Sequence, residues 1–186
     1  MLARLKPIHK YTLIIIAGLT LQGCATNATI DGMVPASHDT KNKELYNNIH
    51  INENTGGHET NPLWTSKINN SNFHGALIQS LKNAKLYNES IKSRYVLDTN
   101  IVDLNQDFFG LELTYRLKVG YNIINRSANK SVYHKIINTK YTATTSDSII
   151  GVRRLRLANE GAARKNIGEF IASLNNLKIL STEIKD

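Results

Sequence analysis

A stretch near the middle of the chain alternates strictly between apolar residues and polar residues or glycine. Every odd position from 111 to 123 is aliphatic or aromatic: Leu111, Leu113, Tyr115, Leu117, Val119, Tyr121 and Ile123. Successive side chains of a β-strand point to opposite faces of a sheet, so this period of two predicts a long strand with one buried and one solvated face. The chain must therefore fold around a sheet whose apolar face is covered by a second layer.

Two further stretches predict strands that pair with this one. Residues 94–104 carry apolar side chains at alternate positions, and residues 105–110 are predicted to form the loop between the two strands. The polar segment Asn125–Lys130 predicts a hairpin loop. Residues 132–145 after it are rich in β-branched and aromatic side chains, which favours a third strand. The prediction is a sheet of three antiparallel strands.

Helical periodicity flanks the predicted strands on both sides. Ser71 or Asn72 can cap a helix whose apolar positions recur every three or four residues as far as about Leu86. A second helix is predicted over about Val152–Leu177, again with an apolar stripe along one side. These two helices supply the second layer that the sheet requires.

The predicted order of elements is helix, three antiparallel strands, helix, which makes a two-layer α+β domain over residues 61–180. A short tail follows at residues 181–186. Trp64 is expected to be a core or interface anchor just ahead of the first helix. Gly161 and Gly168 are seven residues apart and so lie nearly on one side of the second helix, which predicts close approach to another element there.

The first residues of the chain are typical of a secretory signal. Residues 1–10 carry three basic side chains and no acidic one, and residues 11–21 form a largely apolar run. A membrane-spanning helix needs about 20 apolar residues, roughly twice the length of this run. A cleaved signal peptide over residues 1–23 is therefore predicted rather than a permanent span.

The signal ends at Leu21-Gln22-Gly23-Cys24, which resembles the lipobox of bacterial lipoproteins. The resemblance implies cleavage between Gly23 and Cys24, with a diacylglycerol thioether and an N-acyl chain on Cys24. It further implies sorting to the outer membrane, because Ala25 resembles the default residue at the sorting position. Such acyl chains anchor a protein by about 0.8 kcal/mol for each buried methylene group. The alternative is an unmodified Cys24 beside a conventional cleavage site.

Residues 24–60 are predicted to be a flexible tether between the lipid and the domain. Asn47–Thr60 is polar, rich in asparagine and contains Gly56 and Gly57, with no period of a helix or a strand running through it. A tether of this kind would let the domain stand away from the bilayer. A short strand at Ile49–Ile51 is the alternative.

The basic residues are concentrated in the second half of the chain. The full sequence has a net charge of +8, and removal of three basic residues with the signal leaves 20 basic and 15 acidic residues, or +5. Residues 24–90 hold five basic and six acidic residues, whereas residues 91–186 hold fifteen and nine. Nucleic acid is an implausible partner on the periplasmic side of a membrane, so lipid phosphates or an acidic protein surface are expected instead.

Arg153, Arg154 and Arg156 stand out within this basic half. Three cations in the first turn of a helix oppose its macrodipole, which favours anions at that end by about 0.3–1 kcal/mol per charge. One interpretation is a cluster that contacts an anionic partner through guanidinium groups. The other is that the helix begins later, near Leu157, and that the arginines lie on a solvated connection.

No catalytic or metal-binding constellation is recognisable. The six histidines lack a metal-ligand spacing, and His58-Glu59 is interpreted as a solvated pair of loop residues. Asp98 and Asp103 have an odd separation on one strand, so they are expected to face opposite sides. There is no nucleophile elbow and no phosphate-binding glycine loop, so neither an enzyme such as a hydrolase nor a cofactor is expected.

A lipobox, a tether and a small α+β domain together resemble small outer-membrane lipoproteins that assist envelope machinery. Among these are the lipopolysaccharide-assembly lipoproteins, the transport-auxiliary lipoproteins and the lipoprotein subunits of secretion rings. The resemblance implies a non-enzymatic structural or assembly subunit of a larger envelope complex, anchored to the outer membrane and facing the periplasm. The alternative is a monomeric carrier that holds a small amphiphile between its helices and its sheet, although Tyr115 and Tyr121 are expected to fill that space as core residues.

Overall fold

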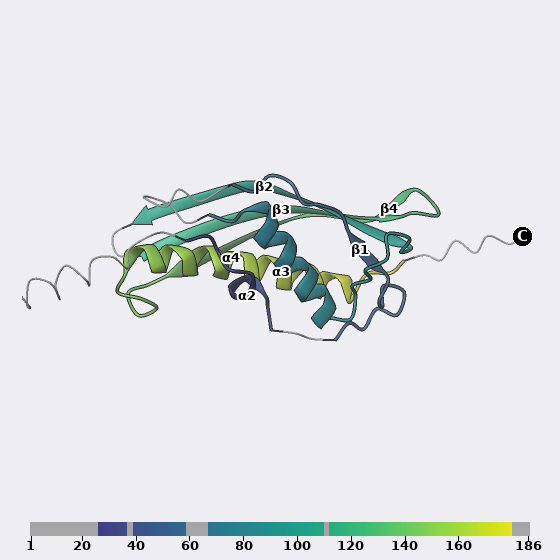
Figure 1. Cartoon of the computed structure of the whole chain (residues 1–186), viewed down its shortest axis with the longest axis horizontal. Coiled ribbons are helices and arrows are strands. Elements are labelled where there is room, and N and C mark those ends of the chain that lie inside the picture. The colour runs from purple at the N-terminus through teal and green to yellow at the C-terminus, as the bar shows by residue number, and fades with distance from the viewer. Residues whose placement is uncertain (1–25, 37–38, 59–66, 110–111, 180–186) are drawn as a thin grey trace, which may run out of the picture.

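The computed structural model describes residues 26–36, 39–58, 67–109 and 112–179. These residues form a mixed α+β domain in which helices cover one face of an open sheet (Figure 1). Its elements, in chain order, are α2 (Ile30–Met33), β1 (Ile49–Ile51), α3 (Asn70–Asn83), β2 (Tyr95–Phe109), β3 (Glu112–Asn125), β4 (Lys130–Ala143) and α4 (Gly151–Leu174).

The sheet has four strands in the order β1-β2-β3-β4. β1 is parallel to β2, whereas β2, β3 and β4 are antiparallel neighbours. The predicted α+β class is confirmed. The predicted numbers are wrong, because the described residues form four strands rather than three and three helices rather than two. β3 shows the expected alternation, because its odd-numbered residues are buried and its even-numbered residues are partly or fully exposed.

β2 is longer than the sequence predicts. The predicted loop at residues 105–110 is wrong, because the strand continues to Phe109, which pairs with Glu112. A β-bulge between Ile101 and Asp103 adds one residue to β2. The bulge explains the missed strand, because an extra residue reverses the alternation of side chains beyond it.

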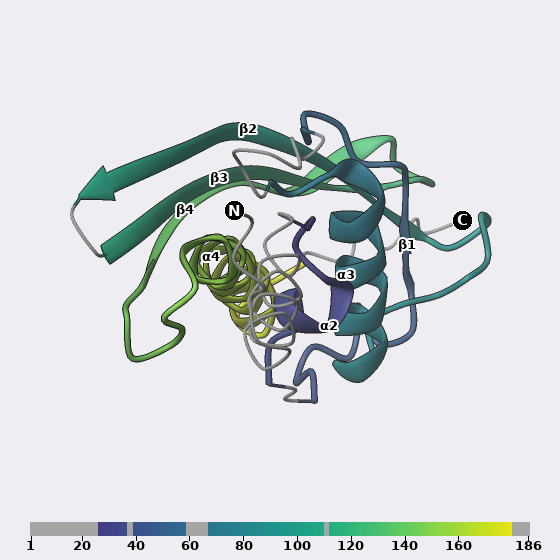
Figure 2. The same cartoon turned by 60° about the vertical axis from the view of Figure 1, so that its left-hand side comes forward.

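α4 lies along the underside of β3 and β4 and runs antiparallel to β4, as Figure 2 shows with the helix seen nearly end-on. α3 lies beside α4 on the same face of the sheet, and the single turn of α2 packs against both helices. The core between the layers is formed by aromatic and aliphatic side chains from both, among them Tyr121, Phe73 and Phe170. Tyr115 and Tyr121 are both buried, as predicted for core residues.

The predicted tether is wrong for residues 26–58 as far as they are described. β1 belongs to the sheet, as the alternative prediction of a short strand at Ile49–Ile51 had it. Several apolar side chains of this stretch are fully or almost fully buried in the core, namely Ala28, Met33, Leu45, Ile49 and Ile51. They are widely and irregularly spaced, so they create no helix or strand period in the sequence. The domain therefore begins at or before Thr26 rather than near residue 61.

The helix boundaries differ slightly from the predictions. α3 begins at Asn70, and its capping residue is Asn69, whose side chain accepts from the amide of Asn72. α4 begins at Gly151, so the alternative start near Leu157 is wrong. None of the helices in the described part of the chain is both long enough and apolar enough to cross a membrane. The signal with Gly23 and Cys24, the segment with Trp64 and the tail at 181–186 lie outside the described residues.

Candidate functional site

The three arginines at the start of α4 have different surroundings. Arg153 is exposed. Arg154 is buried, and its Nη1 donates to the carbonyl oxygens of Ser148 at 2.7 Å and Ile149 at 3.0 Å. The guanidinium of Arg156 is bonded to Thr26 and paired with Glu160. The predicted cluster of three cations facing one anionic partner is therefore wrong, and only Arg153 is wholly available to such a partner.

Arg156 and Glu160 fasten the first described residues to α4. Nη1 of Arg156 donates to Oγ1 of Thr26 at 3.0 Å, and its Nε lies 3.6 Å from Oε1 of Glu160. The buried carboxylate of Glu160 also accepts from the amide and the hydroxyl of Thr29, at 2.9 and 2.8 Å. A buried charge is tolerated when it is paired and hydrogen-bonded in this way. We call Arg156, Glu160, Thr26 and Thr29 the clamp.

Two large apolar side chains are exposed at the amino end of α4. Ile149 is 89% exposed and Ile150 is 44% exposed. Ile150 occupies the N-cap position, and its side chain makes no capping hydrogen bond. The exposed Arg153 follows within the first turn of the helix. Apolar and cationic side chains therefore meet at one end of the domain.

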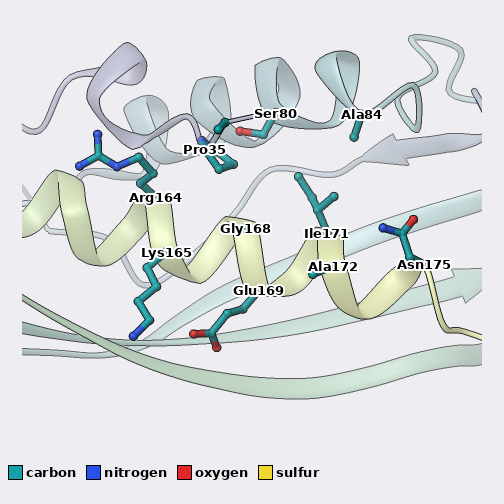
Figure 3. Close-up of a pocket in the computed structure, with 11 residues that line it drawn as sticks. Pro35, Ser80, Ala84, Arg164, Lys165, Gly168, Glu169, Ile171, Ala172 and Asn175 are labelled. Carbon is teal, nitrogen blue, oxygen red and sulfur yellow. The ribbon is translucent and has the colours of Figure 1, made fainter. Parts of the chain in front are cut away.

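A groove of about 470 Å³ lies between α4 and the carboxyl half of α3 (Figure 3). In Figure 3, Ile171 points toward α3, whereas Lys165 and Glu169 point away from it. The residues that line this interhelical groove are Pro35, Ala36, Ser80, Ala84, Arg164, Lys165, Gly168, Glu169, Ile171, Ala172 and Asn175. The lining combines small and apolar side chains with polar and charged ones, a mixture that could receive a hydrocarbon chain with a polar head group.

The space between α4 and the sheet, which the carrier alternative requires, is filled by side chains. The rings of Tyr121 and Phe170 stack with their centroids 4.0 Å apart. The side-chain amide of Asn166 accepts from the Tyr121 hydroxyl at 2.8 Å and donates to the Ile137 carbonyl at 2.9 Å. A carrier function would have to use the interhelical groove instead.

A second hollow lies beside the amino end of α3. Its walls include Glu53, Asn54, Asn70 and His74, and its volume is about 350 Å³. Burial lowers the pKa of His74 from its ordinary value, an effect that His50 reinforces and Glu53 opposes. Nδ1 of His74 is buried without a hydrogen-bond partner among the described residues. Between residues 26 and 179, as far as they are described, no group of His, Cys, Asp and Glu could hold a metal ion.

The outer face of the sheet carries charged side chains in ion pairs. Asp103 lies 3.4 Å from Lys118, and Asp107 lies 2.9 Å from Arg116. The expectation that Asp98 and Asp103 face opposite sides is wrong, because the bulge between them adds the residue that restores a common face. They are still five positions apart on one strand, and Asp98 accepts from the Asn52 amide at 2.6 Å, so they do not make a paired carboxylate.

Sequence reasoning missed the clamp and the exposed isoleucines. Arg156 and Glu160 have an ordinary i,i+4 spacing, and nothing local indicates that Thr29, more than a hundred residues earlier, completes their hydrogen bonding. Ile149 and Ile150 offered a recognisable signal, because two large apolar residues follow the polar turn Ser146-Asp147-Ser148 directly. The loop that carries them is held by Arg154, which donates to the carbonyl oxygens of Ser148 and Ile149.

No family model and no curated protein matches the sequence. Among solved structures, protein XCC0632 from Xanthomonas campestris is similar at 9% identity and a TM-score of 0.47, over 75% of this chain and 94% of that chain. The PelC dodecamer from Paraburkholderia phytofirmans is similar at 12% identity and a TM-score of 0.47, over 75% and 94%. A minor lipoprotein from Acinetobacter baumannii is similar at 13% identity and a TM-score of 0.46, over 70% and 92%. At these identities and TM-scores, the similarities assign neither a family nor a function.

Proposed function

We propose that the chain is a non-enzymatic lipoprotein of a Gram-negative outer membrane, anchored by acyl chains on Cys24 and facing the periplasm. The lipobox at residues 21–24, with the basic and apolar segments before it, supports lipidation. We further propose that the domain is a structural or assembly subunit of an envelope transport or secretion complex. It needs no cofactor and no metal for this role.

The observation that carries the proposal is how near to Cys24 the folded domain begins. Thr26, two residues later, is already hydrogen-bonded to α4 through Arg156. A lipid on Cys24 would thus hold the domain next to the bilayer. A domain fixed in this way is suited to a stationary subunit more than to a carrier that must leave the membrane.

The anchor is tested by Cys24→Ser in the full chain. Lipidation normally precedes signal cleavage in lipoprotein maturation, so the variant should accumulate as an uncleaved precursor in the inner membrane. The wild type should instead give an intact mass for a chain that begins at Cys24 and carries acyl groups. Ala25→Ser is the matched control, because it retains the thiol and should mature normally. A Cys24→Ser chain that is cleaved and still fractionates with the outer membrane would contradict lipidation.

The subunit role is tested by purification of the lipidated chain in mild detergent. A subunit should co-purify with a large complex of defined composition. A chain that elutes alone would contradict this role.

The interhelical groove favours a second candidate function, the binding of a small amphiphile. A carrier should release a bound lipid on denaturation. Ala172→Trp should obstruct the groove and reduce the amount of lipid released, because Ala172 lines it. Asn176→Trp is the control, because Asn176 is exposed on the next turn and is not a lining residue. Equal lipid in both variants would contradict binding in the groove.

A further inference from the structure

The clamp fixes the direction in which the chain approaches α4. Thr29 is bound to Glu160, and Thr26 is bound to Arg156, which lies one turn nearer the amino end of α4. One helical turn is about 5.4 Å. Followed backward, the chain thus runs along α4 toward its first turn. Two residues span at most about 7 Å, so the covalent chain sets that limit on how far a lipid attached two residues before Thr26 could be from it.

The exposed isoleucines lie at this same end of α4. Ile149 and Ile150 immediately precede its first residue, Gly151. Their exposure belongs to an ordered loop, because Nη1 of the buried Arg154 bonds the carbonyls of both Ser148 and Ile149. The loop is therefore held with the side chain of Ile149 directed into solvent. Isolated exposed apolar residues are common. Ile149 and Ile150 differ from these because they form a pair in an ordered loop, at the end of α4 toward which the chain leads from Thr26.

The charge at this end is also suited to a lipid surface. Arg153 is exposed next to the isoleucines. The nearest acidic group on the loop, Asp147, has a lowered pKa because the amide and hydroxyl of Thr144 donate to its carboxylate, so it is ionised but already hydrogen-bonded. The amino end of a helix has a partial positive charge, and the N-cap side chain here does not offset it. Anionic phosphates would complement both the helix end and Arg153.

We propose that Ile149 and Ile150 insert into the interfacial region of the membrane that holds the Cys24 acyl chains, with Arg153 on lipid phosphates. This inference rests on the proposed lipidation of Cys24 and adds a second membrane contact. An acyl anchor alone leaves a domain free to rotate, whereas two contacts at one end fix its orientation. The turn between β3 and β4 then points away from the bilayer, because it lies at the opposite end of the sheet from Ala143, where β4 leads toward α4 (Figure 1).

The test uses site-specific labels on the full lipidated chain in vesicles. The chain has one cysteine, which lipidation consumes, so Ile149→Cys provides a single reactive thiol. An environment-sensitive fluorophore there should shift to the blue in phosphatidylethanolamine–phosphatidylglycerol vesicles and be quenched by lipids with spin labels on their acyl chains. Ile91→Cys is the matched control. Ile91 is 71% exposed and precedes the end of β2 that pairs with Asn125, at the far end of the sheet, so its label should report water.

Two outcomes separate this inference from the proposed function. If the mass shows acylation and both labels report water, the membrane contact is overturned while the lipoprotein assignment stands. If the chain carries no acyl group, the proposed function fails. For the charged part of the contact, Arg153→Gln should reduce the blue shift at residue 149 and its dependence on salt. An unchanged signal in that variant would remove Arg153 from the contact.

Discussion

The amino and carboxyl halves of α4 are packed differently. In the amino half, a Cβ at Gly161 would overlap the ring of Tyr141 on β4, so the backbone and the ring are in direct contact. In the carboxyl half, a Cβ at Gly168 would lie 3.5 Å from Pro35, an ordinary contact distance, and the interhelical groove opens beside it. The prediction of close approach is confirmed for Gly161, whereas Gly168 has room to spare.

Enclosed polar groups also differ between the sheet side of α4 and the hollow beside the amino end of α3. Asn166, under the sheet, is bonded to Tyr121, Ile137 and Thr139, and an enclosed amide with several partners helps to specify one arrangement of the layers. His74, on α3, has a buried ring nitrogen without a partner among the described residues. The polar contacts on the sheet side of α4 thus specify how the layers pack, whereas the hollow beside the amino end of α3 leaves a buried nitrogen unpaired among the described residues.

The largest effect is expected for Tyr121→Ala. The substitution removes a buried ring stacked on Phe170 and leaves the Asn166 oxygen without its donor. The free energy of unfolding should fall by about 3–5 kcal/mol, measured by urea denaturation. Tyr46→Ala is the control, because Tyr46 is half-exposed and should change stability by less than about 0.5 kcal/mol. Similar losses in both variants would contradict the assignment of the core.

A smaller loss is expected for Glu160→Ala in the clamp. The variant leaves the guanidinium of Arg156 and the hydroxyl of Thr29 without the carboxylate that they share. Stability should fall by about 1–3 kcal/mol. In Glu169→Ala, which removes an exposed carboxylate from the same helix, stability should change little. If the two variants behaved alike, the segment 26–29 would not be fastened to α4.

The two glycines of α4 should respond in opposite directions to alanine. Alanine has a better helix propensity than glycine by about 1 kcal/mol at either position. At Gly161 the added methyl group meets the Tyr141 ring, so Gly161→Ala should destabilise by about 1–2 kcal/mol net. At Gly168 the methyl group has room, so Gly168→Ala should stabilise by about 0.5–1 kcal/mol. A thermal shift of the same sign in both would remove the distinction between the two halves of α4.

The smallest effect is a pH dependence from His74. Because burial lowers its pKa in the folded state, the unfolded chain binds more protons below the ordinary value of 6.5. His74 therefore does not reduce the free energy of unfolding above about pH 6.5, and that free energy decreases as the pH falls below this value. His74→Gln should flatten the profile of denaturation midpoints between pH 5 and 8. Glu53→Gln should make the same profile steeper, because Glu53 raises the pKa of His74. A profile that is steeper in His74→Gln than in Glu53→Gln would show that the histidine does not contribute.

Local sequence patterns could predict the parts of the fold that have a regular period. β3, the turn after it and most of α4 follow from residue spacing, because each buries one continuous face. α2 could not be predicted and β1 appeared only as the alternative of a short strand, since each contributes only a few buried residues to a core built from distant elements. The bulge in β2 has no sequence signature here. It extends the strand and reverses which side chains face outward beyond Ile101.

The candidate site was predictable to a smaller extent. The unusual position of three arginines at a helix start was visible in the sequence, but their separate roles depend on which backbone groups lie within reach after folding. Arg154 is close to the carbonyls of a loop five and six residues earlier, whereas Arg156 meets Thr26 from the other end of the chain. Sequence spacing carries no information on contacts between residues far apart in the chain, such as Arg156 and Thr26.

The central claim is that the fold begins within two residues of Cys24, the proposed site of lipidation, with no tether over residues 26–58 as described. Hydrogen–deuterium exchange on the lipidated full chain in detergent micelles tests it directly. The amides of Ala28, Thr29 and Ile49 donate to Lys67, Glu160 and Leu86, so they should exchange far more slowly than in an unstructured peptide. Exchange of all three at the rate of an unstructured peptide would restore the flexible tether and contradict this account.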